Sequence, residues 1–220
     1  MTGQITNFKN LLTREKALIF RIIHRDNLPW MLNNGLHCRA SGIVDTNYVS
    51  IGNPDLIEKR ATRIVSAAPG GTLDDYIPFY FTPRSPMLLN ILTGYRGIAK
   101  REKHEIIFLI SSLPNLMQNS IPFMFSDRHA GMNTAQFSSD LRTLDRIPWV
   151  GLQTLDFKRD DNDLEKFERY QAEALVHRHL PVSGLIGAAC HDSDSATYME
   201  KCVANSGGDL KIVLRPDWYG

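Results

Sequence analysis

Short apolar runs rich in aromatic and β-branched residues predict several strands along the chain. Such side chains suit the pleated, half-buried surface of a sheet, and turn-forming residues flank each run. The runs cover residues 76–81 (YIPFYF), 105–111 (EIIFLIS), 121–126 (IPFMFS), 173–179 (EALVHRH), 209–215 (DLKIVLR) and, with a less regular pattern, 184–190 (GLIGAAC). They predict a sheet assembled from segments spread over most of the chain.

Helices are indicated mainly by the residues at their ends. Asn53 and Ser85 each precede a proline, an arrangement that caps a helix and fixes the backbone of its first residue. Gly35 and Gly94 suit helix ends. Helices are therefore predicted over residues 55–65, 87–93, 161–171, 195–208 and from 26 or 27 to 32. On the first of these, the apolar spacing places toward the core Leu56, Ile57, Ile64 and Val65.

The order of these elements favours the α+β class, because strands and helices mix without a regular strand–helix–strand alternation. We expect a mainly antiparallel, split β-sheet as the core, with helices on its flanks. The sequence has no internal repeat and no Gly/Ser linker, so we expect a single domain over residues 1–220. The segments 38–53 and 127–163 are long enough to be functional loops.

Composition and charge narrow the classes of protein that the chain can be. No apolar run approaches the roughly 18 residues that span a bilayer, and the N-terminal segment MTGQITNFKNLLTREK lacks the apolar centre of a signal peptide. We therefore expect a cytoplasmic protein without a membrane partner. The formal charge of +1 neither requires nor excludes a nucleic-acid partner, because a basic groove can be balanced elsewhere on the surface.

Cysteines and histidines give no metal-ligand pattern. Cys38, Cys190 and Cys202 form no CxxC pair, so neither a disulfide framework nor a structural zinc site is indicated. His177 and His179 would share a strand face, but no third ligand is spaced to complete a site, and we expect no metal. The sequence also lacks the glycine-rich and serine motifs of Rossmann, P-loop and hydrolase folds.

Glu173 stands where a polar, helix-like run changes into an apolar, strand-like one. In a strand that begins there, Glu173, Leu175 and His177 would share one face. One interpretation is an exposed residue that closes the preceding helix, since most glutamates are solvated. The other is a carboxylate at a cleft edge, where low dielectric strengthens its effect on a developing positive charge.

Two further groups of charged residues allow either a site or an ordinary solvated surface. Arg60 and Arg63 lie three residues apart on one predicted helix, where they form a solvated face or, if they point inward, bind phosphate. Asp127, Arg128 and His129 follow an apolar strand, a position where the backbone is fixed and side chains are accessible. The alternative there is an Asp–Arg ion pair beside a solvated histidine.

Five segments taken together resemble the DarT family, the toxins of DarTG toxin–antitoxin systems. They are FRIIHRDNLPWMLNNGL (20–36), IEKRATRIVSAAPGGTLDDYIPFYFTPRSPML (57–88), IPFMFSDRHA (121–130), YQAEALVHRHLP (170–181) and VLRPDWYG (213–220). The resemblance implies an ADP-ribosyltransferase-like fold that takes NAD⁺, releases nicotinamide and attaches ADP-ribose to a thymine or guanine base in single-stranded DNA, which blocks replication. It also implies a cognate macrodomain-type antitoxin.

The resemblance assigns roles to individual residues. Glu173 matches the catalytic glutamate, and Arg60 matches an arginine implicated in catalysis and NAD⁺ binding. Arg60 would act by positioning and charge, which its high pKa favours, or as a proton acceptor. Ile23 stands where the family often has a hydroxyl residue, so any contact there would use the backbone. The NAD⁺-binding positions implied in all are Arg21, Ile22, Ile23, Trp30, Cys38, Arg60 and Tyr80.

The segment from His129 to Glu173 corresponds to the substrate-recognising loop of the family. Basic groups interleaved with an aromatic ring suit a single strand, because phosphates attract cations and bases stack on rings. The substrate-binding residues expected are Asp127, Arg128, His129, Arg142, Arg146, Trp149, Lys158 and Arg159. The alternatives are an ADP-ribosyltransferase acting on protein or RNA, and a catalytically idle module that binds NAD⁺ or nucleic acid.

Overall fold

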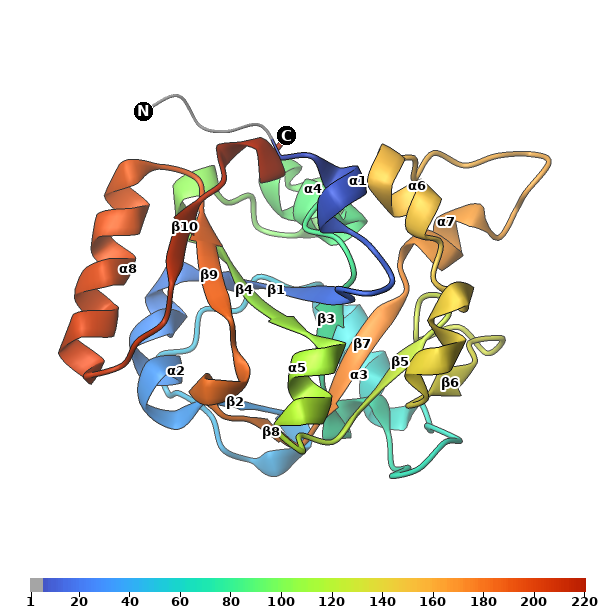
Figure 1. The fold of residues 1–220 in the computed structure, drawn as a ribbon, viewed down its shortest axis with the longest axis horizontal. Coiled ribbons are helices and arrows are strands. Elements are labelled where there is room, and N and C mark those ends of the chain that lie inside the picture. Colours follow the sequence, from blue (N-terminus) through green and yellow to red (C-terminus); the bar gives the residue numbers. More distant parts are fainter. Residues whose placement is uncertain (1–5) are drawn as a thin grey trace.

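A computed structural model, which describes residues 6–220, is built on a mainly antiparallel β-sheet with helices around it (Figure 1). The sheet has eight strands in the order β10-β9-β4-β1-β3-β7-β5-β6. Its strands are β1 (Leu18–His24), β3 (Tyr76–Tyr80), β4 (Ile106–Ser112), β5 (Phe123–Ser126), β6 (Phe137–Ser138), β7 (Glu173–His177), β9 (Gly187–Cys190) and β10 (Ile212–Leu214). A separate ribbon pairs β2 (Leu36–His37) with β8 (His179–Leu180). The predicted α+β class is confirmed.

Helices lie around this sheet, with α8 beside the edge strand β10 (Figure 1). They are α1 (Phe8–Leu11), α2 (Leu28–Asn34), α3 (Pro54–Thr62), α4 (Pro86–Thr93), α5 (Leu113–Gln118), α6 (Trp149–Thr154), α7 (Lys166–Tyr170) and α8 (Ser193–Ser206). Asn53 and Ser85 accept the capping hydrogen bonds that the sequence predicts. The helix predicted over 161–171 is shorter than expected, because residues 160–163 form a turn closed by an Asp160–Asp163 bridge.

β1 and β4 are neighbouring strands inside the sheet, and of the two only β4 was predicted. β1 and β4 are antiparallel over their whole length, from Leu18 opposite Ser112 to His24 opposite Ile106. The run that forms β1 contains Arg21 and continues into a helix signal, so the apolar pattern was not recognised as a strand. β4 is almost entirely buried, which places these two strands in the core.

The eight strands form one sheet, in which β1 and β3 have the shortest pairing. These strands share a single residue pair, Phe20 opposite Tyr80, whereas β3 pairs with β7 from Tyr76 opposite His177 to Tyr80 opposite Glu173. Arg21 Nη1 reaches across this junction and donates to the carbonyl oxygen of Pro78 at 2.9 Å. The half formed by β10, β9, β4 and β1 therefore meets the other half at one point.

Helix α3 is not packed through the apolar face that the sequence predicts. Leu56 and Ile64 are 45% and 67% exposed, and α3 has no buried residue. Val65, just beyond the helix, is buried as expected. The prediction for Leu56 and Ile64 was wrong. Polar contacts of Arg60 and Arg63, rather than apolar packing, attach the C-terminal end of α3 to the rest of the protein.

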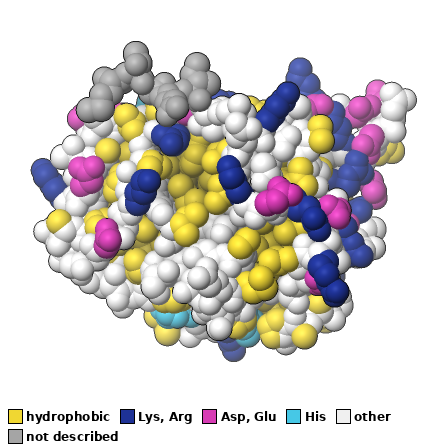
Figure 2. Space-filling view, viewed as in Figure 1, with side chains coloured by type: hydrophobic (Ala, Val, Ile, Leu, Met, Phe, Trp, Pro, Cys, Tyr) yellow, Lys and Arg dark blue, Asp and Glu magenta, His cyan; other side chains and the backbone are white. Residues whose placement is uncertain are grey.

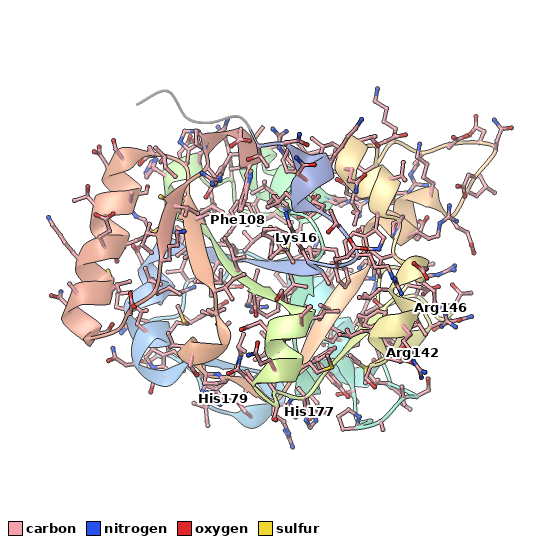
Figure 3. The ribbon with its side chains drawn as sticks, in the orientation of Figure 1. Lys16, Phe108, Arg142, Arg146, His177 and His179 are labelled. Carbon is pink, nitrogen blue, oxygen red and sulfur yellow. The ribbon has the colours of Figure 1, made fainter. Side chains whose placement is uncertain are left out.

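The alternation predicted from Glu173 through His179 stops at His177. Arg178 has a φ of 62°, in the left-handed region, which turns the chain from β7 into β8. His179 consequently lies on the small ribbon, where its ring stacks on His37 with centroids 4.4 Å apart. His177 and His179 both lie at the lower edge of the view in Figure 3.

Basic and acidic side chains are mixed on the surface of the molecule. Figure 2 shows basic and acidic side chains interspersed at the end of the molecule formed by α6 and α7. Within residues 6–220, no helix combines the length and apolarity needed to cross a bilayer.

Candidate active site

Glu173 is a buried carboxylate at the start of β7. Its side chain shares a cross-strand position with Tyr80, and the residue is only 3% exposed. Arg60 Nη1 donates to Glu173 Oε2 at 2.9 Å, and the backbone N–H of Ala130 donates to Glu173 Oε1 at 3.0 Å. The interpretation of Glu173 as an exposed helix end is therefore wrong, since helix α7 ends at Tyr170 and both carboxylate oxygens have partners.

The electrostatics of this site keep Glu173 charged. Burial acts to raise the pKa of Glu173. The electrostatic effects of Arg60 and His129 and the hydrogen bonds from Ala130 and Arg60 together lower this pKa by more than burial raises it. The net result is a pKa below the ordinary value for a glutamate. The side chain can therefore supply a fixed negative charge at neutral pH.

Arg60 and Tyr80 lie next to this carboxylate, and Arg21 lies near Tyr80. Arg60 Nη2 and Arg21 Nε are buried nitrogens that have no hydrogen-bond partner. The Tyr80 hydroxyl donates to Met87 Sδ at 3.4 Å, and burial together with the charge of Glu173 raises the pKa of Tyr80 well above its usual range. The site thus combines one carboxylate, a neutral phenol and two guanidinium groups that keep unused donors.

The loop after β5 is held by its own ion pair. Asp127 Oδ1 accepts from the backbone N–H of Gln136 at 2.9 Å, and the Arg128 guanidinium lies against Asp127 at 3.1 Å. Arg128 Nη1 also pairs with Glu165 at 2.9 Å. The ion-pair interpretation therefore describes Asp127 and Arg128. His129 is half-buried, and it lies close enough to Glu173 to act on that carboxylate electrostatically.

The remaining predicted NAD⁺-binding residues do not all lie with Glu173. Ile22 and Ile23 are 6% and 2% exposed and face Phe108 and Ile107 on β4, so neither side chain is accessible. The backbone N–H of Cys38 donates to the carbonyl oxygen of Arg178, beyond the end of β7 opposite to Glu173.

Trp30 lies in the same region as Cys38. The Trp30 ring contacts His37 edge-on, with centroids 6.0 Å apart, and His37 directly precedes Cys38. Trp30 and Cys38 are therefore grouped with each other, and Arg39, the next residue along the chain, donates to the carbonyl oxygen of Ile57 on α3 at 3.2 Å.

The predicted DNA-binding residues separate into exposed cations and one packed ring. Arg142 and Arg146 project from the segment between β6 and α6, and the Arg142 side chain is 90% exposed (Figure 3). Lys158 and Arg159 are exposed on the loop between α6 and α7. Trp149 instead packs edge-on against Phe81 and donates its indole N–H to the carbonyl oxygen of Leu144, so this ring serves packing.

Sequence reasoning missed two contacts of the site. The Ala130 amide carries no side-chain signal, so its bond to Glu173 could not be read from the sequence. Arg63 Nη2 donates to the carbonyl oxygen of Met132 at 2.8 Å, which ties the end of α3 to the loop after β5. Only the spacing of Arg60 and Arg63 on one helix hinted at a shared role.

Metal chemistry has no ligand set in this region. Within residues 6–220, no three or more His, Cys, Asp or Glu side chains lie together in a way that could hold a metal ion.

Comparison with known proteins places this geometry in a family. A curated DNA ADP-ribosyl transferase of Escherichia coli O127:H6 (strain E2348/69 / EPEC) is 47% identical over 208 residues, which cover 94% of this chain and 95% of the relative. The solved structure of Thermus sp. 2.9 DarT in complex with ADP-ribosylated ssDNA is similar with a TM-score of 0.86 at 29% identity, covering 94% of this chain and 97% of that chain.

A second solved structure, Thermus sp. 2.9 DarT in complex with NAD⁺, gives a TM-score of 0.80 at 28% identity and covers 94% of this chain and 98% of that chain. These similarities confirm the ADP-ribosyltransferase-like fold. The family model for DarT, described as ssDNA thymidine ADP-ribosyltransferase, matches residues 20–220. This chain therefore belongs to the DarT family of NAD⁺-dependent single-stranded-DNA ADP-ribosyltransferases.

Proposed function

We propose that Glu173 and Arg60 are the catalytic pair of a toxin that transfers ADP-ribose from NAD⁺ to a thymine base in single-stranded DNA. Nicotinamide is released, and the modified base blocks replication. The observation that carries this assignment is the buried ion pair between Glu173 and Arg60, in which Arg60 keeps a second, unpartnered nitrogen.

The role of Glu173 follows from the charge that develops during the reaction. Nicotinamide leaves with the electron pair of its bond to ribose C1′, so positive charge builds up on the sugar. A fixed carboxylate stabilises that charge, and losing one such contact typically costs about 10²–10³ in rate. A nucleophilic atom of the base then bonds to C1′ and gives up its proton to a neighbouring group or to solvent.

The unpartnered guanidinium nitrogens fit the other half of NAD⁺. Buried donors without an acceptor are costly, and a pyrophosphate would satisfy Arg60 Nη2 and Arg21 Nε. Arg60 acts by positioning and by charge, because guanidinium scarcely deprotonates. Tyr80 lines the same site, and Ile22 and Ile23 could contribute only their backbone.

Trp30 and Cys38 would meet the adenosine half of NAD⁺. An extended dinucleotide is long enough to run from Glu173 toward the opposite end of β7, where Cys38 bonds to Arg178. This assignment rests on the family resemblance and on the placement of both residues in one region.

The loop after β5 is proposed to bind the DNA strand. His129 lies next to Glu173, where the target base must approach. Asp127 and Arg128 shape the loop through their ion pair. The exposed cations that would meet phosphates are Arg142, Arg146, Lys158 and Arg159.

The cell requires an activity that opposes such a toxin. By resemblance to DarTG systems, the partner is a macrodomain-type antitoxin that binds the toxin or removes the ADP-ribose. The site of action is the cytoplasm, because bacterial DNA replicates there.

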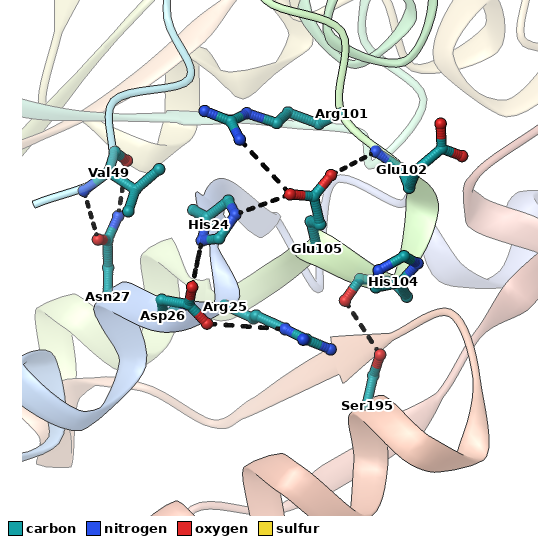
Figure 4. Close-up of polar contacts among 10 residues, drawn as sticks. All are labelled: His24, Arg25, Asp26, Asn27, Val49, Arg101, Glu102, His104, Glu105 and Ser195. Carbon is teal, nitrogen blue, oxygen red and sulfur yellow. Dashed lines mark hydrogen bonds and ion pairs between the residues drawn. The ribbon is translucent and has the colours of Figure 1, made fainter.

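A matched pair of variants tests the assignment. Glu105 offers the control, because it also pairs with an arginine, Arg101, and accepts a backbone N–H, that of Glu102 (Figure 4). Glu173→Gln should lower transfer by about 10²–10³ or more, whereas Glu105→Gln should leave it near the unmutated rate.

The measurement is mass spectrometry after incubation with NAD⁺ and four acceptors: a mixed DNA strand, the same strand without thymine, RNA and protein. Modification of the thymine-free strand would refute thymine as the target, and modification of RNA or protein alone would refute DNA. Equal transfer by Glu173→Gln and the unmutated enzyme would refute the catalytic pair.

A further inference from the structure

We infer that Ser126 is a positioning residue, whose buried hydroxyl fixes the Ala130 amide against the Glu173 carboxylate. This inference rests on the proposed catalytic role of Glu173. Ser126 is the last residue of β5 and is fully buried.

The Ser126 hydroxyl accepts a backbone hydrogen bond just beyond the last paired residues of β5 and β7. β5 and β7 pair from Phe123 opposite Val176 to Phe125 opposite Ala174, and the regular pairing ends there, one residue before Glu173. At the next position, the backbone N–H of Glu173 donates to Ser126 Oγ at 3.2 Å. The same hydroxyl donates to the carbonyl oxygen of Arg128 at 2.6 Å. Ser126 thus joins the backbone of the catalytic residue to the loop.

Three consecutive residues of this loop are fixed one after the other. The Arg128 carbonyl accepts from Ser126, the His129 N–H donates to the carbonyl oxygen of Glu168 at 2.9 Å, and the Ala130 N–H donates to Glu173 Oε1 at 3.0 Å. The Arg128 carbonyl and the His129 N–H belong to the same peptide unit, which is therefore held on both sides, and the Ala130 N–H belongs to the next unit, whose orientation depends on it. The hydroxyl of Ser126 therefore sets where the Ala130 N–H points.

Removal of the hydroxyl has a defined consequence. It leaves two buried backbone groups without a partner, the N–H of Glu173 and the carbonyl of Arg128, and each would shift toward another partner. The Ala130 N–H would move with them and weaken its bond to the carboxylate. Misplacement of a catalytic group by about 1 Å can cost roughly 100-fold in rate.

The charged and titratable groups around Glu173 come from three elements. They are Arg60 from α3, Tyr80 from β3 and His129 from the loop after β5. Substitution of Ser126 changes none of these side chains. A hydrogen bond to the ionised carboxylate lowers its pKa, so weakening the Ala130 bond should move the acidic limb of the pH–rate profile to higher pH.

Ser111 provides a matched control on the other half of the sheet. It is also fully buried, its hydroxyl donates to the carbonyl oxygen of Gly184 at 2.7 Å, and it accepts from Asn115 Nδ2 at 3.4 Å. Ser111→Ala removes the same group with a similar loss of hydrogen bonds. It should leave the acidic limb where it lies in the unmutated enzyme.

The experiment measures kcat, KM for NAD⁺ and the pH profile of kcat/KM for ADP-ribose transfer to single-stranded DNA. Ser126→Ala should lower kcat by about 10- to 100-fold with KM changed less than about twofold, and should move the acidic limb upward. Ser126→Thr keeps the hydroxyl and should restore most of kcat. Ser126→Cys, of similar volume but with a weak donor, should resemble Ser126→Ala and remain measurable if the alanine variant folds poorly.

Two results would overturn the inference. One is that Ser126→Ala and Ser126→Cys have the same kcat as the Ser111→Ala control and the acidic limb of their pH–rate profiles at the same pH. The other is that Ser126→Ala and Ser111→Ala lower kcat equally without moving the limb, as a general loss of stability would. Failure of the proposed function looks different, because Glu173→Gln would then remain as active as the unmutated enzyme.

Discussion

At the scale of single residues, the charge of Glu173 depends on its neighbours. A buried carboxylate without partners would take up a proton, but Arg60 and the Ala130 amide each occupy one of its oxygens. The same ion pair limits Arg60, which can meet a ligand only with the nitrogens that Glu173 leaves unused. In the proposed function, positioning of the acid and binding of the dinucleotide are thus coupled through one guanidinium.

Variants of Arg60 should separate charge from geometry. Arg60→Lys keeps a cation and should retain part of the activity, with a higher KM for NAD⁺ because the forked donor is lost. Arg60→Ala leaves the carboxylate unpaired, so it should cost about 1–3 kcal/mol of unfolding free energy and move the acidic limb of kcat/KM upward. Urea denaturation and pH–rate profiles test both. An unchanged acidic limb in Arg60→Ala would contradict the coupling.

At the scale of elements, α3 is a helix that carries Arg60, the proposed catalytic arginine, without burying any residue in the core. It begins at the Asn53 cap and is held at its far end by Arg60 and Arg63. A helix with no buried residue gains little stability from packing, so its end contacts decide how often it is formed. The position of Arg60 should therefore respond to changes far from the active site.

Asn53→Ala tests this dependence. Loss of the cap typically costs about 1 kcal/mol, which should raise the KM for NAD⁺ up to about fivefold and speed hydrogen exchange within α3. Ser85→Ala is the control, because it removes the equivalent cap of α4, a helix that buries Leu88 and Ile91. That variant should lower the melting temperature and leave KM unchanged. A rise in KM with Ser85→Ala alone would disprove the role of the α3 cap.

The elements also show which features the sequence could predict. The caps at Asn53 and Ser85 were predictable because each depends on residues a few positions apart. β1 was not, since its apolar run contains Arg21 and merges with a helix signal. The inward direction of Arg60 depends on Glu173, 113 residues away, and periodicity along one helix carries no information about that distance. Family resemblance assigned both residues to one site, but their direct ion pair was not predicted.

At the scale of the whole molecule, the two halves of the sheet meet at one residue pair. Glu173 and Tyr80 belong to one half, while Arg21 belongs to the other and crosses the junction through its bond to Pro78. Stability of the halves and geometry of the site are therefore linked. Each half carries a glutamate–arginine ion pair that can contribute to the stability of the fold. Glu173 lies on β7 and pairs with Arg60, and Glu105 lies next to β4 and pairs with Arg101.

Acid should weaken the fold in a predictable range. The pKa of Glu105 is lowered, first by the backbone N–H of Glu102, and the pKa of Glu173 is also lowered. Groups with lowered folded pKa values stabilise the protein above the unfolded value, about 4.3 for glutamate, and lose that contribution as pH falls through the folded values. The contribution of these two glutamates to the unfolding free energy should be constant above about pH 5 and should decrease as the pH falls below about 5.

Urea denaturation at several pH values measures this fall. Glu173→Gln removes one of the titrating groups, so its unfolding free energy should depend less on pH below about 5. An identical slope in both proteins would contradict the contribution of Glu173.

The two ends of the described chain are joined to each other. The backbone N–H of Thr6 donates to Asp217 at 2.7 Å, and the indole N–H of Trp218 donates to Thr6 Oγ1 at 2.9 Å (Figure 1). A short linker could therefore connect these ends in a circularly permuted protein. Reopening the chain at Gly207 and Gly208, an exposed turn between α8 and β10, would keep every strand pairing. It would also place new ends for a fluorescent label next to β10, which is separated from β7 by four strands of the sheet.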